Sequence, residues 1–166
     1  RYASMLYDQL NADAATVNPL MGSDSVEPFL EYGNHLTFLL CLTSNPGADD
    51  FLLKDGLYKE IARKASEWSN LGNVGLVTGA TRPEYLREIR EIAPDLPFLI
   101  PGIGAQGGNL EETLSNAKMT GDYPGILVHV TRGILPEDET DREPKEVIRE
   151  KLSTLEQQIE KQLSKN

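Results

Sequence analysis

The sequence has 166 residues, of which 39% are hydrophobic and 25% are charged, and its formal net charge is −10 at pH 7. This length and composition predict one domain, or a large part of one, with a packed core, and they argue against disorder. The negative charge argues against a nucleic-acid partner, because such a chain repels a phosphate backbone. Cys41 is the only cysteine, so no internal disulfide can form, and its apolar neighbours predict a small buried side chain.

No stretch reaches the roughly 20 apolar residues of a membrane-spanning helix, and no basic-then-apolar leader opens the chain. We therefore expect a cytoplasmic protein without a membrane partner. From Arg1 onward, the first residues have the pattern of a helix interior.

Five short apolar runs predict buried strands. Each run is nearly continuous rather than alternating, which is typical of strands covered on both faces in a parallel sheet. The runs span residues 13–18, 36–43, 74–78, 97–100 and 125–130.

Helical patterns fill the intervals between these strands, and several begin at a residue whose side chain favours a helix start. These candidate caps are Asp24, Thr81 paired with Glu84 in a capping box, and Asn109. Residues 55–69 place their apolar side chains on one stripe, which is typical of a helix that packs on a core.

Pro144 opens a long terminal helix with an apolar stripe at spacings of three and four residues. The stripe consists of Ile148, Leu152, Leu155, Ile159 and Leu163. Such a stripe favours a helix that lies on a sheet or barrel, and a coiled-coil seam is the alternative.

Repeated strand–helix units with right-handed crossovers are compatible with two architectures. One is a five-stranded doubly wound sheet. The other is part of an eight-stranded (β/α)8 barrel, which usually needs ~250 residues. The number of strands alone leaves both open. In either architecture, ligands bind beyond the carboxyl ends of the strands.

The loop after the fourth strand is the sharpest candidate site. Four glycines and Gln106 lie between Gly102 and Asn109, where a helix begins, so backbone N–H groups can approach an anion closely. This pattern predicts a phosphate site that includes Gly104, Gly107 and Gly108, and a flexible turn is the alternative reading.

The fifth strand is followed by Thr131, Arg132 and Gly133. In a barrel, the last two strand–helix loops form a frequent phosphate site, and a guanidinium can bind phosphate oxygens through two parallel hydrogen bonds. We therefore expect Arg132 to contact phosphate. A surface salt bridge is the alternative.

Ser44 and Asn45 follow the second strand, in a turn before Pro46, and they suit hydrogen bonds to the polar edge of a ring. An ordinary turn motif is the alternative, and Asn18 after the first strand is a weaker case of the same kind. His129 lies within an apolar strand, which favours a core or interface position. No metal-ligand cluster, Ser–His–acid arrangement or strand-end lysine is visible, so the sequence predicts no metal site and no catalytic acid–base group.

Several segments together resemble orotidine 5′-phosphate decarboxylase, most closely its bacterial type 2 form. They span residues 11–29, 43–48, 75–83, 92–109 and 130–133. The resemblance implies a (β/α)8 barrel that is active as a dimer, of which residues 1–166 supply strands four to eight as the C-terminal part of one domain. The resemblance also implies an incomplete barrel, completed by another chain with strands one to three. The family's Asp/Lys/Asp network and the lysine of its second strand have no counterpart in this sequence.

The resemblance implies conversion of orotidine 5′-monophosphate (OMP) to uridine 5′-monophosphate (UMP) without metal or organic cofactor. In its terms, Ser44 recognises the pyrimidine, and Pro101 and Gly102 lie beside the base. Gln106 lies in a closing loop and reaches towards the phosphate, which Arg132 binds. An ammonium lysine from the missing strands would stabilise the carbanion at C6 and protonate it.

Two hypotheses follow from these observations. In the first, the chain is the C-terminal subunit or fragment of a decarboxylase, complemented by an N-terminal barrel fragment of the same enzyme and inactive alone. In the second, it is a non-catalytic phosphate-binding or self-associating half-barrel.

Overall fold

The computed structural model describes residues 1–121, 123–136 and 142–164. Five parallel strands form one sheet in the order β1-β2-β3-β4-β5. They are β1 (Ala14–Val17), β2 (Leu36–Leu42), β3 (Val74–Thr78), β4 (Phe98–Pro101) and β5 (Ile126–His129). Each predicted strand is therefore confirmed, with its ends within one residue of the prediction.

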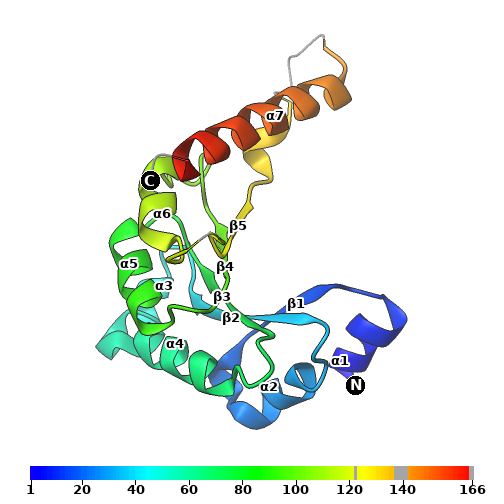
Figure 1. The fold of residues 1–166 in the computed structure, drawn as a ribbon, viewed down its shortest axis with the longest axis vertical. Helices are drawn as coiled ribbons and strands as arrows, with labels where there is room; N and C mark the ends of the chain where they lie inside the picture. Colours follow the sequence, from blue (N-terminus) through cyan, green and yellow to red (C-terminus); the bar gives the residue numbers. More distant parts are fainter. Residues whose placement is uncertain (122, 137–141, 165–166) are drawn as a thin grey trace.

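The order of the strands decides between the two architectures. A doubly wound sheet reverses its strand order at a switch point, whereas here every strand pairs with the next one along the chain. Sequential parallel pairing is the arrangement of a (β/α)8 barrel, and five strands form an open part of one. Figure 1 shows this partial barrel as a curved sheet with helices α4, α5 and α6 along one side.

The helices begin and end close to the predicted positions. They are α1 (Tyr2–Ser4, continued by a π-helical turn over Met5–Gln9), α2 (Ser23–Leu30), α3 (Ala48–Phe51), α4 (Leu57–Trp68), α5 (Pro83–Ile92), α6 (Leu110–Ala117) and α7 (Pro144–Leu163). The terminal helix α7 packs against α6 and against the 3₁₀ turn Arg132–Ile134, called the Arg132 turn below. None of the described helices is long and apolar enough to cross a membrane.

Two of the three candidate helix caps are wrong. Gly22 precedes α2, so Asp24 lies inside that helix, and Arg82 precedes α5 with no side-chain cap. The Thr81 hydroxyl instead donates to a backbone carbonyl of a neighbouring loop, which removes it from the capping box. The Asn109 cap is confirmed, because its Oδ1 accepts a hydrogen bond of 3.1 Å from the N–H of Glu112.

The core lies between the sheet and its helices. Leu39, Leu76 and Phe98 are aligned across β2, β3 and β4, and all three are fully buried in this core. Cys41 belongs to the same core, as predicted, and its thiol donates to the carbonyl of Tyr58 at 3.2 Å. Burial raises the pKa of the Cys41 thiol.

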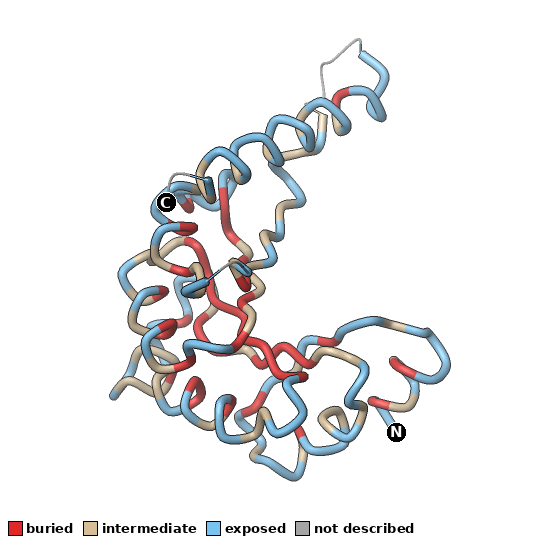
Figure 2. The backbone as a smooth tube through the Cα atoms, in the orientation of Figure 1, coloured by how far each residue is buried: buried red, intermediate tan, exposed pale blue. Residues whose placement is uncertain are grey.

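The opposite face of the sheet is only partly covered. Successive side chains on a strand alternate between faces, so the next aligned row points away from the helices. That row consists of Leu40, Val77, Leu99 and Leu127. Val77 is buried, but Leu40 and Leu99 are half-buried, and Leu127 on the last strand is 45% exposed. The prediction of strands covered on both faces is therefore wrong for this inner row, because the described residues include no strands facing it. Figure 2 shows the buried residues gathered along the sheet and the adjoining helix faces.

Arg90 fastens α5 to the sheet. It is 9% exposed, and its Nε donates to the carbonyl of Ala117 at 2.8 Å. Its other nitrogens donate to the carbonyls of Ala93, Pro94, Leu96 and Gly125, the shortest at 2.6 Å to Leu96. The guanidinium also lies 3.6 Å from the centre of the Phe98 ring. Burial lowers the pKa of Arg90 to about 10, so the group remains charged at neutral pH.

Replacing this guanidinium tests its structural role. We expect Arg90→Lys to lower the free energy of unfolding by about 2–4 kcal/mol, because an ammonium cannot reach several carbonyls at once and leaves buried acceptors unpaired. Urea unfolding of the whole chain measures the change. Arg87→Lys is the matched control, since exposed Arg87 on the same helix bonds only the side chain of Asn116. Equal effects of the two substitutions would contradict the role given to Arg90.

Candidate functional site

The candidate site residues all follow the carboxyl ends of strands. Because the five strands are parallel, these ends lie at one edge of the sheet, where barrel enzymes bind their ligands. Ser44 follows β2, the glycine-rich loop of residues 102–108 follows β4, and the Arg132 turn follows β5.

One hydrogen bond connects two of the predicted site residues. The hydroxyl of Ser44 donates to Oε1 of Gln106 at 2.8 Å, although 62 positions separate them along the chain. Ser44 is half-buried and Gln106 is exposed. The bond thus joins the turn after β2 to the tip of the glycine-rich loop, across the end of β3.

The loop after β3 holds the Ser44 turn in place through hydrogen bonds to its backbone. Thr81 donates from its hydroxyl to the backbone carbonyl of Ser44 at 3.2 Å, and the N–H of Gly79 donates to the carbonyl of Leu42 at 2.7 Å. Arg82 forms an ion pair with Asp49 of α3. The sequence analysis missed this support, because it interpreted the Thr81 hydroxyl as a helix cap.

Glycines bring these loops into close contact. A Cβ added to Gly79 would lie 2.7 Å from Cα of Ser44, and one added to Gly108 would lie 2.6 Å from the carbonyl oxygen of Gly102. Gly102 also has a φ of +102°, which favours glycine, and its Cα faces the Ser44 side chain. A larger residue at position 79 would have to move the Ser44 backbone, and one at position 108 would have to move Gly102 or Ala80.

The glycine-rich loop uses several of its own amides. The N–H groups of Gly104, Gly107 and Gly108 donate to the carbonyls of Gly108, Gly104 and Gly102, at 3.1, 2.7 and 3.0 Å. Among the described residues, the N–H groups of Ala105 and Gln106 at the loop tip make no such backbone bond. Because they lie at the exposed loop tip, these two amides can donate to a ligand.

Arg132 is exposed, and within the described parts of the chain its guanidinium has no ion pair or side-chain hydrogen bond. The salt bridge considered as its alternative role is thus not formed there. The neighbouring Thr131 hydroxyl lies 3.1 Å from Nε2 of His129. His129 is exposed, so of the two positions expected for it the core is wrong, because its place on the strand points the ring away from the helices, and the interface stays a prediction.

Asn18 has a local structural task. Its Oδ1 accepts a hydrogen bond of 3.0 Å from the N–H of Leu20 and caps the 3₁₀ turn Pro19–Met21. This is the turn motif that the sequence analysis named as the alternative to ligand binding, although the amide nitrogen of Asn18 is not used in the turn.

The loops at this edge hold polar groups and two cations, Arg132 and Arg82, of which Arg82 is paired with Asp49. Segments 18–22, 43–47, 79–82, 101–109 and 131–133 contain no lysine, aspartate or glutamate. The described residues also hold no cluster of three or more His, Cys, Asp or Glu side chains placed to bind a metal. The chemistry that this arrangement supports is therefore the binding of an anionic, polar molecule.

Comparison with known proteins assigns the chain to a protein family. The model of the orotidine 5′-phosphate decarboxylase / HUMPS family matches residues 1–147. The chain belongs to this family. An orotidine 5′-phosphate decarboxylase from Dehalococcoides mccartyi is 47% identical to it over 142 residues, which are 81% of this chain and 52% of the relative.

Solved structures agree with this assignment. An OMP decarboxylase from Leishmania donovani is 40% identical with a TM-score of 0.76, and the match covers 90% of this chain and 58% of that one. A UMP synthase from the same organism is 43% identical with a TM-score of 0.78, over 92% of this chain and 35% of that one. The predicted family and the partial-barrel fold are therefore confirmed. The chain spans about half the length of the curated relatives it matches.

The close packing around Ser44 gives a test of the site geometry. We expect Gly79→Ala to lower the free energy of unfolding by about 1–3 kcal/mol, because the added methyl group overlaps the Ser44 backbone and overpacking costs about this much. Urea unfolding measures the loss. Gly47→Ala is the control, since its Cβ would come near movable side-chain atoms of Asn45 and Asp50 and no backbone atom. Full stability of the Gly79 variant would show that the Ser44 turn is not fixed by this contact.

Proposed function

We propose that this chain forms the substrate-holding part of an orotidine 5′-phosphate decarboxylase, which converts OMP to UMP. In this proposal Ser44 binds the pyrimidine, with Pro101 and Gly102 beside the ring. Gln106 and Arg132 hold the phosphate. Family membership and the chain's position in the barrel support the proposal. The cytoplasmic location expected from the sequence stays a prediction.

The hydrogen bond between Ser44 and Gln106 is the observation that carries the assignment. It connects the residue proposed for the ring to the loop proposed for the phosphate. A nucleotide that engages both ends would hold this loop in place, so binding energy from the remote phosphate would help to position the ring. The same link accounts for a loop rich in glycine, which must approach the Ser44 turn closely.

The remaining candidate residues have a supporting place in the proposal. In the proposal, Gly104, Gly107 and Gly108 shape the loop, and the N–H groups of Ala105 and Gln106 at its tip donate to phosphate oxygens. Thr131 and Gly133 flank Arg132 and set the course of the turn that presents its guanidinium. Asn18 stays a weaker candidate for a contact with the ligand, through its amide nitrogen.

The bond-breaking group would come from strands one to three of the barrel. During decarboxylation the bond between C6 and the carboxylate carbon breaks, carbon dioxide leaves, and the electron pair stays on C6. A lysine ammonium beside C6 would stabilise that charge and then give it a proton. The loops of this chain contain no lysine at the strand ends.

The open sheet supports completion by those strands. β1 and β5 each pair on one side only, and the inner row ending in Leu127 is partly exposed. Unpaired strand edges and an uncovered apolar face favour the addition of further strands. We propose that an N-terminal part with strands one to three, on the same polypeptide or a separate one, closes the barrel, and that completed barrels pair as dimers.

Mixing tests the proposed completion. The chain is purified alone and also with a family fragment that contains strands one to three, and the loss of OMP absorbance is followed. We expect decarboxylation only in the mixture, because this chain has no lysine at its strand ends that could act on C6. A mixture that forms a complex and stays inactive would contradict the decarboxylase proposal. Self-association of the chain, with phosphate binding and no activity, would favour the non-catalytic half-barrel instead.

Arg132 is tested in the completed barrel. We expect Arg132→Ala to lower kcat/KM for OMP by roughly 30-fold or more, because removing one partner of a bonded charge pair costs about 2–5 kcal/mol. Steady-state kinetics measure the loss, and orotidine, which lacks the phosphate, should be turned over unchanged. Arg63→Ala is the control, since Arg63 pairs with Glu60 on the surface of α4. An unchanged rate with OMP would remove Arg132 from the phosphate site.

A further inference from the structure

A lysine of α7 holds the end of the Arg132 turn. The ammonium of Lys151 donates a hydrogen bond of 2.8 Å to the backbone carbonyl of Leu135, 16 positions earlier in the chain. Leu135 directly follows the Arg132 turn and closes it, since its N–H donates to the carbonyl of Arg132 at 3.4 Å. Within the described residues, Lys151 has no carboxylate partner, so its ammonium interacts with this carbonyl instead.

The Arg132 turn faces α7 across a partly open space. A cavity of about 430 Å³ lies between the turn and α7. Its walls are Ile103, Gly104, Gly108, Leu110, Val130, Gly133 and Ile134 on the loop side, and Glu150, Lys151, Thr154, Leu155 and Gln158 on the helix side. Packing therefore fills only part of the space, and the two backbone bonds inside the turn are long, at 3.2 and 3.4 Å. Lys151, the donor of the hydrogen bond to Leu135, is one of the residues that line this cavity.

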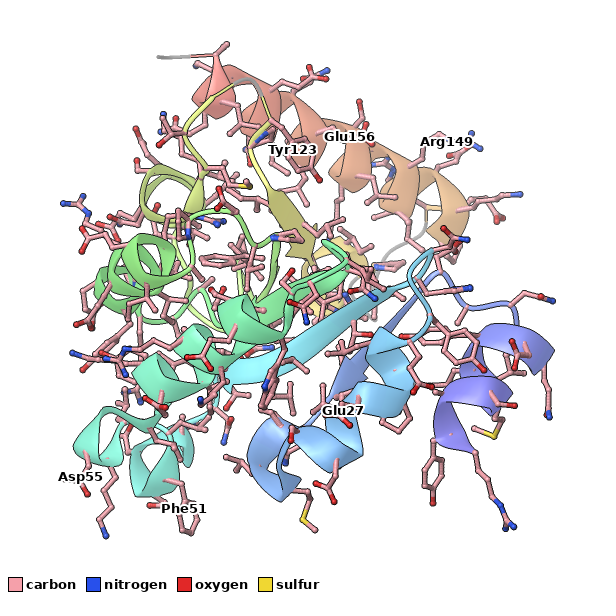
Figure 3. The ribbon with its side chains drawn as sticks, turned by 60° about the horizontal axis from the view of Figure 1, so that its bottom comes forward. Glu27, Phe51, Asp55, Tyr123, Arg149 and Glu156 are labelled. Carbon is pink, nitrogen blue, oxygen red and sulfur yellow. The ribbon has the colours of Figure 1, made fainter. Side chains whose placement is uncertain are left out.

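The direction of Lys151 follows from the geometry of α7. Side chains advance by about 100° per residue around a helix, so Lys151 lies roughly opposite Arg149. Arg149 and Glu156, seven positions apart, point outward from α7 in Figure 3, and both are exposed. The face with Lys151 is the one that lines the cavity beside the Arg132 turn. Lys151 also lies beyond residue 147, where the match to the family model ends.

We infer that Lys151 is a positioning residue for phosphate binding: it fixes the Arg132 turn, and through it the guanidinium, without touching the substrate. This inference rests on the proposed function, because it gives Lys151 a purpose only if Arg132 binds the phosphate of a nucleotide. The interaction that would fix the turn is the single hydrogen bond from the Lys151 ammonium to the carbonyl of Leu135.

The kinetic test uses Lys151→Met in the completed barrel. We expect KM for OMP to rise about 3- to 10-fold with kcat changed less than about 2-fold, the size expected from one accessible hydrogen bond. Lys151→Arg, which keeps a donor of similar reach, should restore most of the loss. Orotidine should react equally well with the variant and the wild type, because it has no phosphate for Arg132 to bind. Arg149→Met removes a charge from the opposite face of α7 and should change none of these values.

Two further measurements separate positioning from general damage. In an Arg132→Ala background, Lys151→Met should have no additional effect on KM. In the unliganded chain, the variant should speed amide hydrogen exchange at residues 134 and 135 by about 3- to 10-fold, and Arg149→Met should not. If the wild-type barrel decarboxylates OMP, and the Lys151 variant has an unchanged KM and unchanged hydrogen exchange, the inference about Lys151 is wrong and the proposed function stands. A wild-type barrel without activity would overturn the proposed function and the inference together.

Discussion

Parallel pairing in chain order is the constraint on which the rest of the structure depends. It places the loops after β2, β3, β4 and β5 at one edge of a curved sheet, so residues far apart in sequence become neighbours. The bond between Ser44 and Gln106 forms because only the end of β3, followed by the small residues Gly79 and Ala80, separates their loops. The same pairing leaves β1 and β5 as edges and leaves the inner row partly uncovered.

The positions of the strands and the identity of the site loops could be predicted from the sequence, because apolar runs and glycine clusters are local signals. The Ser44–Gln106 contact could not be derived from such signals, since it depends on the registers of two strand pairs. Thr81 shows why the role of a hydroxyl cannot be predicted from its local sequence. A threonine hydroxyl can cap a helix or donate to a carbonyl of another loop, and in the folded chain it donates to the carbonyl of Ser44. The prediction that both faces of each strand are buried was wrong for Leu127. A nearly continuous apolar run indicates that both faces of a strand need to be covered, but it does not indicate which residues cover them.

The site separates holding a molecule from transforming it. Its loops offer a hydroxyl, amides and a guanidinium, all suited to an anionic, polar molecule, and they carry no lysine, aspartate or glutamate. In a chain of net charge −10, the exposed guanidinium of Arg132 is a local exception that an anion can reach. The Arg132 backbone is bonded to Leu135, which in turn accepts the hydrogen bond of Lys151.

Arg90 has a consequence for motion in the sheet. Two of its acceptors, the carbonyls of Leu96 and Gly125, lie just ahead of β4 and β5, so α5 clamps the amino ends of both strands. The carboxyl ends of the same strands carry the glycine-rich loop and the Arg132 turn, which among the described residues are joined to their neighbours by the exposed hydrogen bonds Ser44–Gln106 and Lys151–Leu135. A buried guanidinium with several acceptors therefore holds the base of the barrel segment, and single exposed bonds hold its rim, so the rim can adjust to a ligand while the spacing of the strands below stays constant.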